Sequence, residues 1–132
     1  MKESPIFSRT YDLLLWLIPQ ALKFPRAHRF GLGERLVRQA LDLQETLVAA
    51  GLRRGQERSH LLERADAQLA QLRLVIRLCK DLQLLSVGQY EHVATLLVEI
   101  GRLLGGWKKS LLDSGQAGGG AGGARRLVEQ QS

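Results

Sequence analysis

The chain has 132 residues, 45% of them hydrophobic, enough to bury the core of one domain but not of two. Nineteen Lys and Arg against thirteen Asp and Glu give a net charge of +6. This charge favours a polyanionic partner such as nucleic acid, an anionic membrane surface or an acidic protein, unless the chain is simply a basic soluble protein. The single Cys79 excludes an internal disulfide framework, so we expect a reducing compartment, the cytoplasm.

The longest unbroken apolar run is LLLWLI, at Leu13 to Ile18, between Asp12 and Pro19. It is too short to cross a bilayer and lacks the small-residue cleavage site of a signal peptide. The sequence therefore predicts no targeting or membrane-inserted segment, and we expect no membrane partner.

Apolar residues recur at helical spacing in four segments, and no segment alternates like a strand, which predicts an all-α protein. The first helix is expected over about 6–23, with a kink at Pro19. Its apolar face comprises Tyr11, Leu14, Leu15, Ile18 and Leu22. After a turn at Phe24-Pro25, a second helix over about 32–50 places Leu36, Ala40, Leu43 and Leu47 on one face, and Gly51 is expected to end it.

The third predicted helix, about 56–84, is apolar in two directions. One row has the spacing of a bundle seam and comprises Leu62, Ala65, Leu69, Leu72, Ile76 and Cys79. The second row lies on nearly the opposite side and comprises Ala67, Gln71, Leu74, Leu78 and Leu82. Because a four-helix monomer buries only one row, Leu74, Leu78 and Leu82 are predicted to meet another subunit.

The fourth helix begins at Ser86, where Ser86 and Gln89 have the spacing of a capping box. Its seam comprises Tyr90, Val93, Leu97, Ile100, Leu104 and Trp107. Gly101 and Gly105 extend a small-residue stripe beside that seam, which predicts close approach of a neighbouring backbone and a place in the oligomer interface. Gly106 points outward, and the alternative is that Gly105-Gly106 ends the helix.

A glycine-rich composition begins at residue 113. The expected organisation is thus a bundle domain over 1–112 and a disordered tail over 113–132. The fold class is all-α, an antiparallel four-helix bundle with up-down-up-down topology that assembles into a homo-oligomer.

Catalytic and metal-binding patterns are mostly missing. Glu57 and His60 match one half of a di-iron motif, but no second copy exists. Cys79 lies on the core seam, which favours an inert buried thiol over a nucleophile. We therefore predict no enzyme activity, no metal and no cofactor.

Basic residues form the remaining signal, and the strongest pair is Arg73 and Arg77, one helical turn apart, with Lys80 near the same line. We expect RNA or protein binding through this pair and further clusters at Arg26, Arg29, Arg35, Arg38, Arg53, Arg54, Lys108 and Lys109. The alternative for each residue is a solvated face with local pairs, such as Arg38 with Asp42 or Arg73 with Asp66. Few aromatic residues are present, so binding directed at the phosphate backbone is favoured over base stacking.

Three segments together resemble a known family: LAQLRLVIRLCKDLQLLS at 69–86, QYEHVATLLVEIGRLLGGWKK at 89–109, and the turn Pro25-Arg26-Ala27-His28. The chain resembles the four-helix-bundle proteins that include the accessory variability determinant of diversity-generating retroelements, and the related 23S ribosomal RNA intervening-sequence proteins. The resemblance covers about residues 6–112.

The resemblance implies a basic homopentameric barrel that binds the reverse transcriptase of the retroelement and its template RNA, or an RNA/DNA hybrid. In that role it would be a non-catalytic partner in mutagenic cDNA synthesis. The alternative branch implies a structural homo-oligomer of the intervening-sequence type with an unknown protein partner.

Overall fold

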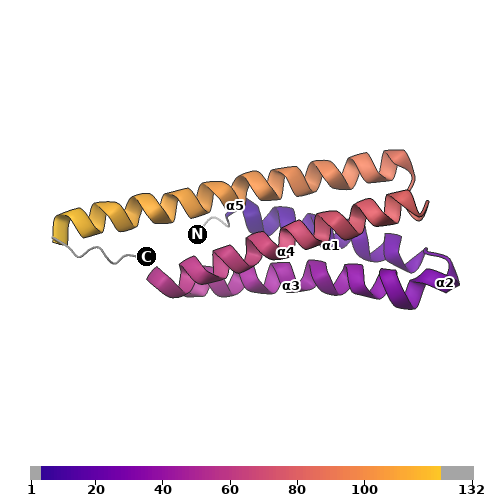
Figure 1. Ribbon diagram of the computed structural model, residues 1–132, viewed down its shortest axis with the longest axis horizontal. Coiled ribbons are helices and arrows are strands. Elements are labelled where there is room, and N and C mark those ends of the chain that lie inside the picture. The colour runs from indigo at the N-terminus through magenta and orange to yellow at the C-terminus, as the bar shows by residue number, and fades with distance from the viewer. Residues whose placement is uncertain (1–3, 123–132) are drawn as a thin grey trace.

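The computed structural model describes residues 4–122 and, for side chains, residues 4–114. Four long helices make up this part of the chain: α1 (Pro5–Leu22), α3 (Glu34–Leu52), α4 (Gly55–Asp81) and α5 (Val87–Gly122). A short helix, α2 (Arg26–His28), and a π-helical turn, η1 (Arg29–Gly33), connect α1 to α3 (Figure 1). The described residues contain no strand, which confirms the all-α class.

The four long helices lie side by side as a bundle (Figure 1). Helix α1 packs mainly against α3 and α5, and α4 packs against the same two helices, so α1 and α4 lie on a diagonal. The α3–α4 connection and the α4–α5 connection are at opposite ends of the bundle. The outer surfaces of α1 and α4 therefore face different sides of the molecule.

The core follows the seams expected for three of the four helices. In α4 the whole predicted row is buried, comprising Leu62, Ala65, Leu69, Leu72, Ile76 and Cys79. In α3 the residues Leu36, Ala40, Leu43 and Leu47 are buried, and in α5 Val93, Leu97, Ile100 and Leu104 are buried, with Tyr90 and Trp107 packed at the edges. In these three helices the predicted apolar row at steps of three and four residues is therefore the face that packs inward.

Helix α1 turns a different face inward from the one expected. Its buried residues are Ile6, Thr10, Leu13, Leu14, Leu17 and Ala21. Of the predicted apolar face only Leu14 is buried, whereas Tyr11, Leu15, Ile18 and Leu22 are exposed. The prediction was wrong because α1 is apolar around most of its circumference, and buried Thr10 is satisfied within the helix by donating to the carbonyl oxygen of Ile6 at 3.0 Å. The helix continues through Pro19 without interruption.

Several helix ends differ from the expected ones. Helix α3 runs past Gly51 to Leu52, and the residue with a left-handed backbone is Gly55, at a φ of 59°. Helix α4 ends at Asp81 rather than 84, because Gln83 in the following turn takes a φ of 63° that breaks the helix. At the start of α5, Ser86 Oγ accepts from the amide of Gln89 at 3.0 Å, and Gln89 Oε1 accepts from the amide of Ser86 at 2.9 Å. This reciprocal pair confirms the predicted capping box.

The last helix also extends beyond the predicted domain boundary. Whereas a disordered tail was expected from residue 113, α5 continues to Gly122. Residues 123–132 of the predicted tail lie outside the described residues. No described helix combines the length and hydropathy needed to span a membrane.

Candidate RNA and partner interface

The glycine at position 101 is explained by a contact within the bundle. A Cβ atom at Gly101 would overlap Nη2 of Arg73 and lie 3.5 Å from Cδ2 of Leu69. Arg73 reaches from α4 across α5, where Nη2 donates a hydrogen bond to the carbonyl oxygen of Leu97 at 3.3 Å. The missing side chain therefore makes room for an arginine of the same chain. At Gly105, the second glycine of the predicted stripe, a Cβ would meet no atom within 4 Å.

Arg73 and Arg77, predicted to act as a pair, have different environments. Arg73 is tied to the backbone of α5, while Arg77 forms no ion pair or hydrogen bond with the described residues. The alternative pairing of Arg73 with Asp66 is wrong, because Asp66 Oδ2 accepts instead from Nζ of Lys108 at 2.6 Å. Of the two arginines, Arg77 is the one whose donors are available to a partner.

Two of the predicted basic residues already have partners on neighbouring helices. Lys108 Nζ lies 2.6 Å from Asp66 and 3.2 Å from Glu63, and the hydrogen bond to Asp66 is the main reason its pKa is raised. Lys80 Nζ lies 4.8 Å from the centroid of the Tyr90 ring and 3.7 Å from Asp81 Oδ1. Lys108 therefore links α5 to α4 through ion pairs. Lys80 links α4 to α5 through the Tyr90 ring and pairs locally with Asp81.

A larger group of cations gathers where α1 turns into α3. The segment 23–38 carries Lys23, Arg26, Arg29, Arg35 and Arg38 against one acidic residue, Glu34. We call these five cations the basic corner. Only Arg29 is held by the described chain, its Nε donating to the carbonyl oxygen of Phe24 at 3.4 Å. Arg38 does not form the local pair with Asp42 that was the alternative, so four cations of the corner have no hydrogen-bond or ion-pair partner among the described residues.

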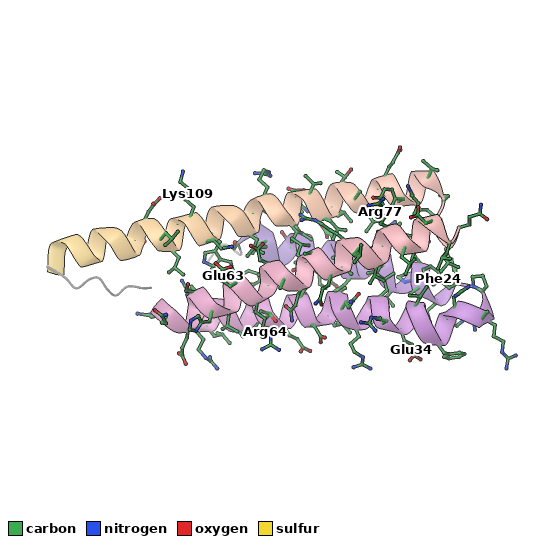
Figure 2. The ribbon with its side chains drawn as sticks, viewed as in Figure 1. Phe24, Glu34, Glu63, Arg64, Arg77 and Lys109 are labelled. Carbon is green, nitrogen blue, oxygen red and sulfur yellow. The ribbon has the colours of Figure 1, made fainter. Side chains whose placement is uncertain are left out.

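The opposite end of the bundle holds a second, weaker group. Arg53 and Arg54 are exposed in the α3–α4 connection, and Lys109 is exposed on α5. Figure 2 places Lys109 at the same end as Glu63 and Arg64. Acidic residues such as Glu57 and Glu63 are interspersed here, so the local charge is more balanced than at the basic corner.

Sequence reasoning missed four basic residues with defined roles or exposure, and one of them, Arg9 of α1, pairs with Asp12 and, at 3.2 Å, with Glu99 of α5. Arg58 closes the end of α3: its Nε donates to the carbonyl oxygen of Ala50 at 2.8 Å, and its guanidinium carbon lies 5.7 Å from the Trp107 ring centroid. Lys23 and Arg64 are exposed and form no ion pair with the described residues. The sequence could have indicated Lys23, because it stands in the same run of basic residues as Arg26 and Arg29.

The leucines predicted to meet another subunit are exposed in the single chain. Leu74 and Leu78 of α4, and Leu82 directly after its end, are 67%, 44% and 46% exposed. Helix α4 therefore has the two-sided apolar character expected from its sequence, with one row in the core and one on the surface.

The surroundings of Cys79, Glu57 and His60 favour a structural role over catalysis or metal binding. Burial raises the pKa of the Cys79 thiol to about 11, which disfavours the nucleophilic thiolate. Glu57 and His60 are exposed at the start of α4, and His60 Nε2 lies 3.4 Å from the side chain of Gln56. The described residues hold no group of three or more His, Cys, Asp or Glu side chains placed to bind a metal ion.

A family model described as bAvd-like matches residues 6–111, which is most of the chain and nearly all of the bundle. The chain belongs to this family. The match confirms the resemblance to accessory variability determinants, which form an accessory, non-catalytic family, and it supports an accessory role in a diversity-generating retroelement. The match ends at residue 111 of α5, so the remainder of that helix lies outside it. Comparison with curated proteins finds no match.

Proposed function

We propose that this bAvd-like chain is a non-catalytic accessory protein that binds the reverse transcriptase and template RNA of a diversity-generating retroelement. We further propose that it acts as a homo-oligomer, the pentamer that its family implies, in the cytoplasm. The observation that carries the proposal is the family match over residues 6–111.

The distribution of unpaired cations supports binding to RNA phosphates. Cations of the basic corner and Arg77 lack acidic partners in the described chain. Contacts from such cations neutralise phosphates and carry little sequence information. If five chains assemble, their summed charge attracts RNA before any specific contact forms.

A salt titration with matched variants tests the RNA-binding part. The test variant, Arg26→Ala with Arg35→Ala, removes two unpaired cations of the basic corner. The control, Arg102→Ala with Lys108→Ala, removes two cations that lie near carboxylates of the same chain. We expect the test variant to lower both RNA affinity and the slope of log affinity against log salt, by about 0.7 for each lost phosphate contact. The control should change the slope much less.

The assay uses the purified chain, alone and with its cognate reverse transcriptase, on the template RNA at low salt. Absence of RNA binding in both arrangements, and absence of a complex with the reverse transcriptase, would contradict the proposed function. In that case the exposed leucines of α4 favour the second candidate, a structural homo-oligomer of the intervening-sequence type. Its contacts would be apolar and much less sensitive to salt.

A further inference from the structure

An open apolar groove lies between the end of α1 and the start of α3, beside the π-helical turn η1. Its volume is about 320 Å³. Gly33 is buried in its wall and allows the close approach of η1 to α1, since a Cβ there would lie 3.2 Å from the carbonyl oxygen of Ala21. We call this feature the α1–α3 groove. Its apolar lining comprises Ile18, Ala21, Leu22, Phe30, Val37 and Leu41.

Apolar stripes on both helices lead away from the groove along the bundle. The start of α1 meets the end of α3, because a Cβ at Gly51 would lie 3.3 Å from Cζ of Phe7. The two helices therefore stay in contact beyond the groove. The exposed stripe of α1 steps by four, three and four residues and comprises Tyr11, Leu15, Ile18 and Leu22. The stripe of α3 comprises Val37, Leu41, Val48 and Leu52, of which only Val37 is half-buried. Each stripe is at least about three helical turns long.

The shape of this surface suits a helix rather than an extended segment. Two packed helices leave a channel between them that the side-chain ridge of a third helix can fill. A helix satisfies its own backbone hydrogen bonds, whereas an extended segment needs a sheet edge, and the described residues contain no strand. Because an exposed apolar surface of this extent marks an interaction site, the expected occupant is an amphipathic helix.

The charges at the groove are predominantly positive. Its ionisable lining residues are Arg29, Arg38 and a single acid, Glu34. Lys23 and Arg35 of the basic corner directly follow lining residues in the sequence. Figure 2 shows Glu34 at the end of the bundle where α1 turns into α3. Arg38 has no hydrogen-bond or ion-pair partner among the described residues, so its guanidinium is available to a carboxylate. The complementary partner is therefore acidic.

We propose that the α1–α3 groove binds one amphipathic, acidic helix of another protein. Apolar side chains on one face of that helix lie against Leu22, Phe30 and Leu41. Glutamate or aspartate side chains on its flanks pair with Arg38 and the rest of the basic corner. This inference goes beyond the proposed function, because it requires neither RNA nor the reverse transcriptase.

Charge and chemistry favour this occupant over a second copy or RNA. Every copy of the chain carries +6, and the exposed Leu74 and Leu78 of α4 stand beside Arg77 and Lys80. A second copy that used these leucines would therefore bring cations to a groove that is already basic. RNA phosphates pair with cations but gain nothing from the apolar lining. An acidic amphipathic helix complements both the apolar lining and the charge.

Two synthetic peptides test the proposal on the full chain. Each has about 14 residues, or four helical turns, with leucines along one face. The other face carries glutamates in one peptide and lysines in the other. Fluorescence anisotropy of the labelled peptide measures binding, and circular dichroism measures its folding. We expect the glutamate peptide to bind and to gain helix content, and the lysine peptide to bind about tenfold more weakly or less.

Two matched pairs of variants locate the binding site. Leu22→Ser removes an apolar group of the groove, and its control, Val98→Ser, removes one of the same exposed fraction, 65%, from α5. Arg38→Glu reverses a charge at the groove, and its control, Arg64→Glu, reverses an exposed, unpaired charge on α4. Each groove variant should weaken binding of the glutamate peptide about tenfold, and each control less than about twofold. All four positions are exposed, so the helix content of the chain should not change.

Four results would overturn the proposal. They are no binding of the glutamate peptide at millimolar concentration, equal binding of the lysine peptide, unchanged affinity in both groove variants, and a lower oligomeric mass of Leu22→Ser by light scattering. The last result would place a second copy in the groove. If Leu22→Ser instead lost RNA affinity and the native chain bound no peptide, the groove would be an RNA site.

The peptide titration contains neither RNA nor reverse transcriptase, so its outcome is separate from that of the proposed function. RNA binding without peptide binding would contradict only this inference. Peptide binding at the groove without binding of RNA or reverse transcriptase would contradict only the proposed function.

Discussion

The guanidinium of Arg73 on α4 occupies the space beside Gly101 of α5 that a side chain there would fill. This relationship explains why a helix keeps a glycine whose backbone freedom costs about 1 kcal/mol relative to alanine. It also separates Gly101 from Gly106, where a Cβ would meet nothing within 4 Å.

Substitution at these two glycines should therefore have opposite effects. Gly106→Ala should raise the free energy of unfolding by about 0.5–1 kcal/mol, because it adds helix propensity in open space. Gly101→Leu should lower it by about 1–3 kcal/mol through overpacking against Arg73 and Leu69. Urea denaturation of both variants measures the difference. Equal stability would show that the Arg73 contact does not restrict position 101.

Substitutions at Arg73 and Arg77, which lie one helical turn apart, should have different effects. Arg77→Ala should weaken RNA or partner binding and leave thermal stability unchanged, because Arg77 has no partner in the described chain. Arg73→Ala should lower stability by about 0.5–1.5 kcal/mol, since it removes the hydrogen bond to the carbonyl oxygen of Leu97. Thermal unfolding and RNA titration of each single variant test this. A loss of oligomeric mass with Arg77→Ala would instead place that residue at the subunit contact.

The capping box should contribute to stability locally. Ser86→Ala removes the acceptor for the amide of Gln89 and should cost about 1 kcal/mol in the free energy of unfolding. Ser110→Ala, at an exposed position within α5, is the control and should be close to neutral. Chemical denaturation is the measurement. If the two variants lost the same stability, the Ser86 hydroxyl would not act as a cap.

Cys79 should make stability fall in alkaline solution. Burial raises the pKa of its thiol from the usual 9.0 to about 11. Between these values the unfolded chain loses the proton while the folded chain keeps it, so stability decreases as pH rises through this window. Below pH 9 the contribution is constant.

Comparison with Cys79→Ala isolates this effect, because the other alkaline groups titrate in both proteins. The difference in the free energy of unfolding between the native chain and the variant should be constant below pH 9. By about pH 10.5 the native chain should have lost stability relative to the variant. In the folded protein at pH 8 the thiol should react slowly with a thiol reagent, and quickly once denaturant is added. Fast reaction in the folded state would contradict burial of Cys79.

Features that depend on one helix alone or on neighbouring residues were predictable from the sequence. The α4 seam from Leu62 to Cys79 is an unbroken row of apolar residues at steps of three and four, whereas the second row of this helix is interrupted by Gln71, and the unbroken seam is buried as expected. The capping box of Ser86 and Gln89 depends on residues three apart, so neighbouring sequence suffices to specify it. The family match likewise confirms a resemblance carried by continuous segments.

Features that depend on which helices meet were decided only by the tertiary structure. Helix α1 is apolar over more than half of its circumference, so its own sequence offers more than one inward face, and packing against α3 and α5 selected the one containing Leu13 and Leu17. The same holds for charges: Lys108 pairs with Asp66 and Arg73 crosses to Leu97, each over more than twenty residues of sequence. Such partners are set by the register of two packed helices, which no single helix encodes, and so the tertiary fold decided which cations remain free to bind.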